Sequence, residues 1–256
     1  MAKDTTNGAS RYGMIVDLDR CSGCGACMVA CAVENNVPPA AASATDRTGI
    51  TWMRVHRLEA AGQGPAAFLP LLCQQCGART PCAAVCPQNA VEVDPRSGIV
   101  AQVPARCLGC RYCMVACPYH ARYFNWWDPD WPGELARTLN PEVSTRTRGV
   151  VEKCTFCNHR LLAARASEAA AGGDAGPAPT YTPACVEACP AGALAFGNLD
   201  DPASDVARLA REPGCFRLLE HLGTESKVFY RSERPWVRRL AQGATSGAAG
   251  DGRSHG

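Results

Sequence analysis

Regular alternation of hydrophobic and polar residues is confined to a few short stretches of this chain. ITWMRVHRLE, at residues 50–59, alternates well enough to predict a strand that adds to a sheet edge. AVEV and GIVAQV flank the turn sequence DPRSG and predict a β-hairpin. NHRLLAARASEAAA, which GGDAGPAPT would end, and SDVARLAREPG predict helices. We therefore expect mixed α and β structure built from short elements.

No stretch of the pattern predicts a membrane span or an export signal. The longest apolar run, AAFLPLLC, is far too short to cross a bilayer, and MAKDTTNGASRYGM has neither an apolar core nor a twin arginine. A 256-residue chain with 46% hydrophobic residues can build a packed core, and its net charge of +2 is too balanced for a nucleic-acid-binding surface. We expect a soluble chain that reaches a membrane through a partner.

The cysteine content points to metal binding: the chain has 17 cysteines, and sixteen of these fall into four groups of four. Most lie in Cys-x-x-Cys or Cys-x-x-x-Cys units, which is typical of metal sites rather than of short secreted disulfide scaffolds. The groups are group I (Cys21, Cys24, Cys27, Cys31), group II (Cys73, Cys76, Cys82, Cys86), group III (Cys107, Cys110, Cys113, Cys117) and group IV (Cys154, Cys157, Cys185, Cys189). Cys215 is left over.

Groups I and III have the spacing C-x2-C-x2-C-x3-C of bacterial [4Fe–4S] proteins. Three closely spaced thiolates cap one side of a cubane, and the fourth reaches a second cluster, so these motifs work in pairs. Small residues in CSGCGAC and CLGC let backbone N–H groups approach the sulfurs. The alternative is zinc, which Cys-x-x-Cys pairs also bind, but zinc does not call for a fourth cysteine beyond the trio.

The hairpin between groups II and III makes these groups similar to one two-cluster ferredoxin, which leaves groups I and IV to pair across the chain. Cross-ligation between paired groups gives the predicted ligand sets. They are quartet 1 (Cys21, Cys24, Cys27, Cys189), quartet 2 (Cys73, Cys76, Cys82, Cys117), quartet 3 (Cys86, Cys107, Cys110, Cys113) and quartet 4 (Cys31, Cys154, Cys157, Cys185). Four sulfur ligands on each cluster leave no open iron, so we expect an electron carrier without catalytic residues.

The order of the groups resembles the iron–sulfur subunit of the complex iron–sulfur molybdoenzymes, such as dimethyl sulfoxide, polysulfide, tetrathionate and nitrate reductases. The resemblance runs from about residue 11 to about residue 230 and is most specific in DLDRCSGCGACMVAC, RCLGCRYCMVACPYHARYF, VEKCTFC and PACVEACPAGALAFGNLDDP. It implies electron transfer between a molybdenum or tungsten bis-pterin catalytic subunit and an integral membrane subunit that handles quinone. It also implies that quartet 1 lies nearest the catalytic subunit.

Two departures from the family pattern concern the cysteine loops. Group II has five residues, GARTP, between Cys76 and Cys82 where many relatives have four, and group I has Ala32 in place of a proline after its last cysteine. Neither removes a ligand. Cys110 is present where some nitrate reductase subunits lack a cysteine, so we expect four [4Fe–4S] clusters and no [3Fe–4S] cluster.

The expected fold is α+β, with two pseudo-symmetric bacterial two-cluster ferredoxin-like modules, loop insertions and a C-terminal extension. Residues 11–35 with 150–200 would form the outer module and residues 68–128 the inner one. Residues 36–67 would be an insertion with a strand, residues 201–232 the extension and residues 233–256 a disordered tail. The complex would sit at the cytoplasmic membrane through its partners, on the cytoplasmic face by default.

Two alternatives use the same cysteines. One is a soluble polyferredoxin, or the corresponding subunit of a hydrogenase or formate dehydrogenase complex, and the other is a zinc-dependent structural or nucleic-acid-binding module. Purification with or without a pterin-containing partner separates the first from the molybdoenzyme subunit. Colour and metal content separate the second, because iron–sulfur proteins are brown and contain about four iron and four sulfide per quartet.

Residues outside the groups have structural interpretations. The aromatic stretch RYFNWWDPDWP is expected to pack around a cluster, with partner docking as the alternative. Cys215 is expected to be a small buried hydrophobe, and the basic residues Arg146, Arg148 and Lys153 to be solvated, with the countering of cluster charge as the alternative. The five histidines are not expected to be ligands; they are His56, His120, His159, His221 and His255.

Overall fold

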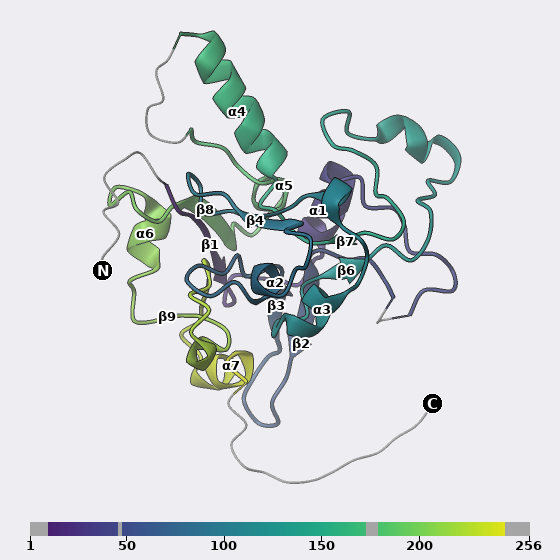
Figure 1. Ribbon diagram of the computed structural model, residues 1–256. Helices are drawn as coiled ribbons and strands as arrows, with labels where there is room; N and C mark the ends of the chain where they lie inside the picture. Colours follow the sequence, from purple (N-terminus) through teal and green to yellow (C-terminus); the bar gives the residue numbers. More distant parts are fainter. Residues whose placement is uncertain (1–9, 46–47, 173–178, 244–256) are drawn as a thin grey trace.

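A four-stranded mixed sheet joins the two ends of the chain. The computed structural model describes residues 10–45, 48–172 and 179–243. The strand order is β8–β1–β10–β9, with β1 parallel to β10 and antiparallel to β8. The bounds are β1 Tyr12–Asp17, β8 Leu194–Asn198, β9 Cys215–Phe216 and β10 Val228–Arg231. Because β1 leads into group I and β8 follows group IV, this sheet brings the first and last cysteine groups together (Figure 1).

Short helices carry the cysteine groups and pack against each other in pairs. Helix α1 packs on α5, which joins groups I and IV, and α2 packs on α3, which joins groups II and III. The bounds are α1 Ala26–Glu34, α2 Pro81–Ala84, α3 Tyr112–Ala116 and α5 Ala184–Glu187. The helix pairs therefore join the same cysteine groups that the spacing pairs.

Helix α1 is longer than the other three because it lacks a proline. In groups II, III and IV a proline follows the last cysteine, at Pro87, Pro118 and Pro190, and the helix ends before that cysteine or earlier. Proline disfavours helical geometry at the preceding residue. Ala32 lifts this restriction, so α1 continues past Cys31 to Glu34. The departure noted in the sequence thus has a structural consequence that the sequence did not indicate.

Three further two-stranded ladders surround the helices. The predicted hairpin is confirmed as β4 with β5, paired from Val91↔Gln102 to Val93↔Val100. The strand predicted in residues 50–59 is present in its second half as β2, but it pairs with β3 in a separate two-stranded sheet rather than at the edge of a larger one. The ladder β6–β7 links the end of group III to the start of group IV. The bounds are β2 Arg54–Leu58, β3 Ala67–Leu71, β4 Val91–Val93, β5 Val100–Gln102, β6 Tyr123–Phe124 and β7 Val151–Glu152.

Both predicted helices outside the groups are present. Helix α4, Asn158–Ala170, stands out from the body at the top of Figure 1, and α6, Asp205–Leu209, lies against β8. Part of GGDAGPAPT, the predicted stop of α4, lies outside the described residues. Short 3-10 turns complete the elements, as η1 Pro104–Arg106, η2 Gly133–Thr138 and η3 Glu220–Leu222. Within the described ranges, no helix has the length and apolar character needed to cross a bilayer.

The C-terminal residues are more ordered than the sequence indicates. A disordered tail is expected from residue 233, but residues Pro235–Ala241 form helix α7, with Trp236 and Val237 buried. Pro235 at the first helical turn and the apolar side chains of Trp236 and Val237 explain why the segment folds onto the body. The remainder of the predicted tail, from residue 244, lies outside the described part of the chain.

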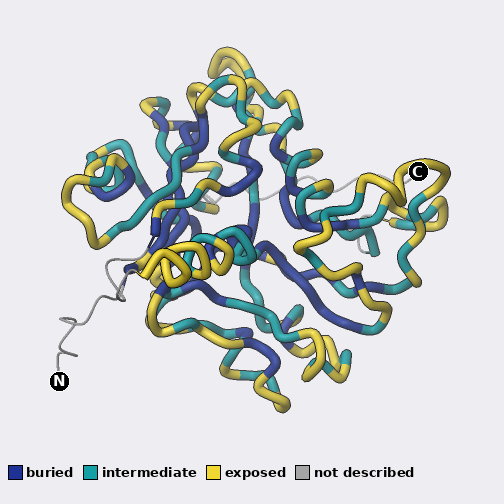
Figure 2. Tube along the Cα trace, turned by 90° about the horizontal axis from the view of Figure 1, so that it is seen from above, coloured by how far each residue is buried: buried dark blue, intermediate teal, exposed yellow. Residues whose placement is uncertain are grey.

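The main core lies behind and between the cysteine loops. Buried segments occupy the interior while exposed loops form the rim (Figure 2). Met14 and Val16 of β1 and Val228 and Tyr230 of β10 have 0% exposure, and they pack in one cluster with cysteines of groups I, II and IV. The segment after group IV is therefore part of the core that supports the cysteines.

Candidate metal centres

The four cysteine groups share one local backbone feature. The residue before the second cysteine has a positive φ in every group: Gly23, Gln75, Gly109 and Phe156, at 73°, 49°, 75° and 55°. Left-handed backbone is unfavourable for Gln and Phe, so its recurrence there indicates that the turn itself is required. At Gly109 an added Cβ would meet the carbonyl oxygen of Gly149. The chain thus builds the same cysteine turn four times.

Three cavities are each bounded by one predicted quartet. The first is lined by the cysteines of quartet 1, the second by those of quartet 2 and the third by those of quartet 3. Their volumes, counted with the solvent at their mouths, are about 330, 330 and 310 Å³. Near-equal volumes and the same four donors fit one kind of occupant at all three places.

The members of quartet 4 also lie together, in the interior. All four are buried. Burial and then the charges of Cys154, Cys185 and Cys157 raise the pKa of Cys31 well above its ordinary value. Burial and then Cys154 and Cys157 do the same to the pKa of Cys185. Thiolates this close and this desolvated need a positively charged partner, which a metal centre supplies.

Backbone N–H groups point at several of the sulfurs. Ala90 donates to Cys86 Sγ at 3.2 Å and Ala193 to Cys189 Sγ at 3.3 Å. Phe156 donates to Cys154 Sγ at 3.4 Å. At Cys86 desolvation acts to raise the pKa, but backbone donors at residues 88, 90 and 91 outweigh it, so the pKa is lowered. Such N–H···S contacts stabilise thiolate ligands and help set a cluster's potential.

Two of the three cations of the basic stretch are buried, contrary to the expectation of a solvated stretch. Lys153 is fully buried and donates through Nζ to the carbonyl oxygens of Val100 and Cys154. Arg146 is buried too, where its Nη1 donates to Glu152 at 2.8 Å. The stretch runs beside the interior ladder β6–β7, which removes both side chains from solvent. Arg148 alone matches the solvated interpretation, in an exposed pair with Asp128.

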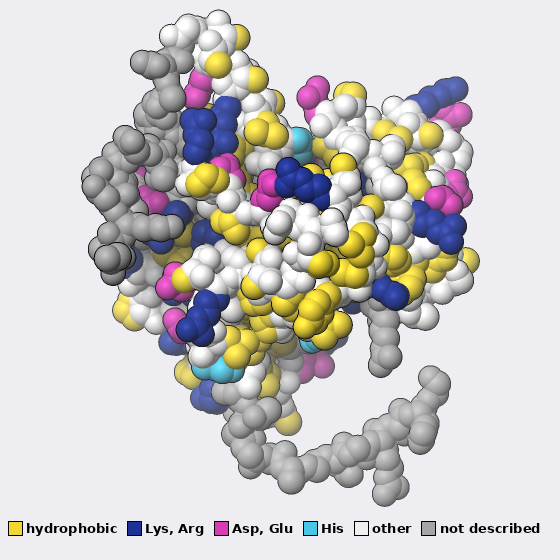
Figure 3. All heavy atoms as spheres, viewed as in Figure 1, with side chains coloured by type: hydrophobic (Ala, Val, Ile, Leu, Met, Phe, Trp, Pro, Cys, Tyr) yellow, Lys and Arg dark blue, Asp and Glu magenta, His cyan; other side chains and the backbone are white. Residues whose placement is uncertain are grey.

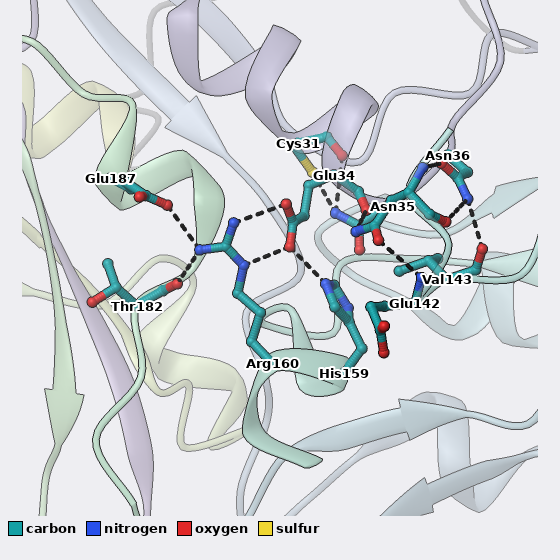
Figure 4. Close-up of polar contacts among 11 residues, drawn as sticks. Cys31, Glu34, Asn35, Asn36, Glu142, Val143, His159, Arg160, Thr182 and Glu187 are labelled. Atoms are coloured by element: carbon teal, nitrogen blue, oxygen red, sulfur yellow. Dashed lines mark hydrogen bonds and ion pairs between the residues drawn. The ribbon is translucent and has the colours of Figure 1, made fainter. Parts of the chain in front are cut away.

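The extension of α1 delivers a carboxylate to the junction of three helices (Figure 4). Glu34 accepts hydrogen bonds from His159 Nε2 at 2.7 Å and from Arg160, whose Nη2 lies 2.8 Å away. Arg160 also donates through Nη1 to the Thr182 carbonyl and to Glu187, both at 2.8 Å. Hydrogen bonds from Arg160 lower the pKa of Glu34, and burial opposes them. This network ties α1, α4 and α5 together beside quartet 4.

We expect Glu34→Gln to weaken this junction and to speed the loss of iron from quartet 4. Two charge-assisted hydrogen-bond partners lose their anion, which costs about 1–3 kcal/mol. Because the folded-state pKa of Glu34 is lowered, the carboxylate's contribution is present above its ordinary pKa and is lost as the pH falls through the lowered value. At neutral pH the full effect is therefore measurable, as the rate of iron release to a chelator.

Glu187→Gln is the matched control for Glu34→Gln. Both carboxylates bind Arg160, but the Glu187 side chain is 65% exposed, whereas that of Glu34 is 14% exposed. Exposed ion pairs contribute little, so Glu187→Gln is expected to release iron at nearly the wild-type rate. Equal rates for the two variants would show that the junction does not protect quartet 4.

The histidines and Cys215 were the remaining candidate residues. His159 pairs with Glu34, while His56, His120 and His221 are exposed. His255 lies outside the described residues. Cys215 is half-buried rather than fully buried, on β9, where burial raises its pKa to about 11. Strand β9 is the edge of the sheet, which explains why one side of this cysteine remains open.

Some residues of the aromatic stretch after group III pack around the cysteine loops, as expected, and others are placed where a partner could dock. Tyr123 is buried, and Phe124 meets Trp126 edge-on at 4.7 Å between ring centroids, with the Arg111 guanidinium over both rings. These contacts pack around the cysteine loops. Trp131 instead lines an apolar groove along α1, whose volume, counted with the solvent at its mouth, is about 1,020 Å³.

The residues present fit an iron–sulfur cluster. Thiolates are soft donors of the type that such clusters require. At quartet 2, Arg122 lines the cavity, and its buried Nε and Nη1 have no protein acceptor. Cluster sulfides would provide acceptors for these N–H groups. The spacing of the chain predicts the cysteines, but it does not indicate Arg122, Gln75, Lys227 or Glu34; the unusual burial of their charged or amide groups is what identifies them.

Family models match two overlapping parts of the chain. Residues 17–90 and residues 65–131 each match a model described as a 4Fe-4S dicluster domain. The first covers groups I and II and the second covers groups II and III. The match establishes [4Fe–4S] clusters as the cofactors and decides against the zinc alternative.

Curated relatives align with nearly the whole chain. The menaquinone reductase iron–sulfur cluster-binding subunit of Nitratidesulfovibrio vulgaris is 48% identical over 90% of this chain and 92% of its own length. The Hdr-like menaquinol oxidoreductase iron–sulfur subunit 1 of Archaeoglobus fulgidus is 41% identical over 86% and 82%. The arsenate respiratory reductase iron–sulfur subunit of a Shewanella species is 34% identical over 86% and 95%. All three are named as iron–sulfur subunits of reductases or oxidoreductases.

Proposed function

Because the chain belongs to the family of iron–sulfur electron-transfer subunits of molybdoenzyme-like respiratory complexes, we propose that its sixteen grouped cysteines hold four [4Fe–4S] clusters in the order of quartets 1, 4, 2 and 3. Three quartet-lined cavities and one buried quartet support this assignment. Bound clusters supply one-electron carriers, and the chain positions them as a conductor.

Helices supply the links within each half of this order. Cys27 and Cys31 lie four residues apart on α1, so one helical turn separates a ligand of quartet 1 from a ligand of quartet 4. Cys185 and Cys189 make the second link between the same quartets. The same four-residue spacing, from Cys82 on α2 to Cys86 just beyond it and from Cys113 on α3 to Cys117 just beyond it, links quartets 2 and 3.

The two halves meet between Cys154 of quartet 4 and Cys73 of quartet 2. Burial raises the pKa of Cys154 to about 12, and Cys73 is the first of the charges that add to this shift. Gln75, with 0% exposure, donates through Nε2 to the Cys154 carbonyl at 2.9 Å and accepts from the Val100 N–H at 2.8 Å. These contacts support a continuous path through the interior of the protein.

The ends of the proposed order approach the surface. Cys24 of quartet 1 and Cys110 of quartet 3 are exposed, whereas quartet 4 is buried throughout. Around quartet 3, hydrophobic side chains gather over α2 and α3 (Figure 3), and they include Val115, which is 81% exposed. An exposed apolar area of this kind is typical of a partner-binding surface. Electrons would therefore enter and leave at opposite ends, through two different partners.

For the partners, we propose a pterin-containing catalytic subunit at quartet 1 and an integral membrane, quinone-handling subunit at quartet 3. The family resemblance supports the first assignment, and the apolar surface supports the second. Two relatives are named for menaquinone or menaquinol, which supports a quinone of that class. The chain itself would bind at the membrane through these subunits and catalyse no bond-forming step.

Anaerobic purification of the tagged chain from its own host tests this function. We expect a brown complex with about four iron and four sulfide per quartet, together with a large pterin-containing chain and a membrane chain. Either a quinol of the menaquinone class should reduce the clusters of the complex, or the corresponding quinone should oxidise them, and electron paramagnetic resonance (EPR) spectra would follow the cluster signals.

Other outcomes of the same purification would contradict the proposal. A brown chain isolated alone would indicate a soluble polyferredoxin. A large partner without pterin would indicate a hydrogenase-type complex, and a pterin-containing partner that oxidises formate would indicate a formate dehydrogenase. Iron well below four per quartet would contradict the assignment of the ligands.

A further inference from the structure

Three buried cations from remote parts of the chain converge on quartet 2. Arg122 follows group III, Lys153 precedes group IV and Lys227 precedes β10, and they are 3%, 0% and 5% exposed. The β6–β7 ladder pairs Tyr123 with Glu152, so the next step of this register places Arg122 opposite Lys153. Both line the quartet 2 cavity, and Lys227 Nζ donates to the Cys76 carbonyl at 3.0 Å.

Within the described part of the chain, these cations have no carboxylate partner. Among the described residues, none of the three takes part in a salt bridge, and their hydrogen bonds go to carbonyl oxygens and to Gln102. Burying an unpaired cation is costly unless a negative charge lies near. The negative groups that act on Arg122 are the sulfurs of Cys82, Cys113 and Cys73, which outweigh burial and raise its pKa.

Lys227 is buried, and its Nζ lies against the loop that carries Cys76. Burial lowers its pKa to about 8, and the sulfurs of Cys73 and Cys76 oppose that effect. The negative charge of quartet 2 therefore favours the cationic form of this lysine. The geometry therefore matches these cations to an anionic occupant of the cavity.

The charged side chains beside quartets 1 and 4 include carboxylates, which are absent from the described residues that line the quartet 2 cavity. Burial, and then charges that include Asp17 at Cys21 and Glu34 at Cys157, raise the pKa of both thiols. Quartets 1 and 4 thus each face a carboxylate, but an arginine neutralises it in each case: Arg231 pairs with Asp17 at 2.9 Å and Arg160 with Glu34 at 2.8 Å. Quartet 2 faces three cations, so the local charge distinguishes it from its neighbour in the electron path.

We propose that Arg122, Lys153 and Lys227 raise the reduction potential of the [4Fe–4S] cluster held by quartet 2. This inference rests on the proposed function, in which quartet 2 holds such a cluster. Reduction adds one electron and hence one negative charge, with no bond made or broken, and nearby cations stabilise the reduced form more than the oxidised form. The three side chains therefore favour the electron at the centre of the path.

The positions of the three cations predict a distinct pattern of effects. Lys227 contacts quartet 2 alone. Arg122 also lies near Cys113 of quartet 3, and Lys153 bonds to the backbone of Cys154 of quartet 4. Removal of any one of the three charges should shift the reduction potential of the quartet 2 cluster. Removal of Arg122 should also shift the potential of the quartet 3 cluster by a smaller amount, and removal of Lys153 that of the quartet 4 cluster.

The test is an EPR-monitored redox titration of the purified complex with Arg122→Met, Lys153→Met or Lys227→Met. Each variant should make reduction of the quartet 2 cluster at least about tenfold less favourable, a fall of about 59 mV for a one-electron couple. Arg148→Met, which removes an exposed cation, should leave all four potentials unchanged. Iron and sulfide content measured first shows whether all four clusters are present.

A second pair of variants adds a charge without removing a buried side chain. Thr80 lines the same cavity and precedes α2, so Asp or Asn can replace it as a helix-capping residue. Thr80→Asp and Thr80→Asn differ in charge and hardly in shape. The carboxylate variant should lower the potential of the quartet 2 cluster, and the amide variant should not.

Several results would overturn the proposal. They are unchanged potentials in methionine variants that retain four clusters, shifts in three unrelated signals, or equal potentials in Thr80→Asp and Thr80→Asn. If a methionine variant fails to assemble, the Thr80 pair decides alone. Absence of iron from the wild-type protein would instead contradict the proposed function, which keeps the two failures distinct.

Discussion

Replacing Cys185 with alanine is expected to remove about a quarter of the iron and to stop electron flow between the two ends of the protein. Cys185 is buried in quartet 4, which lies second in the proposed order, between quartets 1 and 2. Loss of one of four ligands at a desolvated site leaves three thiolates whose raised pKa values disfavour the charged state. Quartets 2 and 3 share no ligand with it.

Two measurements follow the Cys185→Ala variant. Iron and sulfide should fall by one cluster, and EPR spectra of the reduced protein should retain the signals of the other three. In the complex, quinol-linked turnover of the catalytic subunit should cease, because the gap between quartets 1 and 2 is no longer bridged. Turnover at the wild-type rate with one cluster missing would contradict the proposed order.

Cys215→Ala is the matched control for this prediction. Cys215 is the cysteine outside the four groups, and it sits on the edge strand β9 beside Ile15 and Phe229. Removing its sulfur should leave the iron content and the turnover unchanged. A loss of iron in Cys215→Ala would mean that ligation extends beyond the sixteen grouped cysteines.

Replacing Tyr230 with alanine is expected to destabilise the protein by about 3–5 kcal/mol, because a large buried aromatic side chain is removed. Tyr230 is fully buried in β10, and its hydroxyl accepts a hydrogen bond from Gln74 Nε2 at 3.0 Å and donates to the Pro70 carbonyl at 3.2 Å. Pro70 and Gln74 flank the start of group II. The side chain therefore joins the central sheet to the loop that carries quartet 2.

Denaturant-induced loss of cluster absorbance under anaerobic conditions measures this effect. Tyr230→Ala should lower the midpoint strongly, and Tyr230→Phe, which loses only the hydroxyl, should lower it by a smaller amount equivalent to about 1–2 kcal/mol. Tyr112→Ala removes the same side chain from an exposed position and should change stability by less than about 0.5 kcal/mol. Equal midpoints for the two alanine variants would show that β10 does not support the clusters.

The cysteine spacing is sufficient to predict which groups of ligands approach each other. A cluster constrains the chain locally, since three thiolates must meet within a few residues, and the fourth lies one helical turn away. The helix pairs α1–α5 and α2–α3 join the groups that this rule pairs. The hairpin β4–β5 and helix α4 could be predicted equally well, because their periodicity and turn residues are local features of the sequence.

Contacts between segments that are far apart in the sequence could not be predicted from such local patterns. Strand β3 reads as a continuous apolar run containing Pro70, and only its pairing with β2 makes it a strand. The segment after residue 201 reads as an extension, yet β10 lies between β1 and β9 in the central sheet. Helix α7 lies at the start of a segment whose sequence is mostly small and polar, and burial of Trp236 and Val237 holds it in place.

The sequence by itself determined the cofactor, its number of copies and the residue types that would hold it. Metal ligation depends on short spacings between cysteines, and these spacings can be seen directly in the sequence. The tertiary structure alone decided the electrostatic environment of each quartet. Arg122, Lys153 and Lys227 are separated by long stretches of chain and meet only when the β6–β7 ladder and the start of β10 close around quartet 2. Charge acts through space, so its effect depends on distances that no spacing along the chain records.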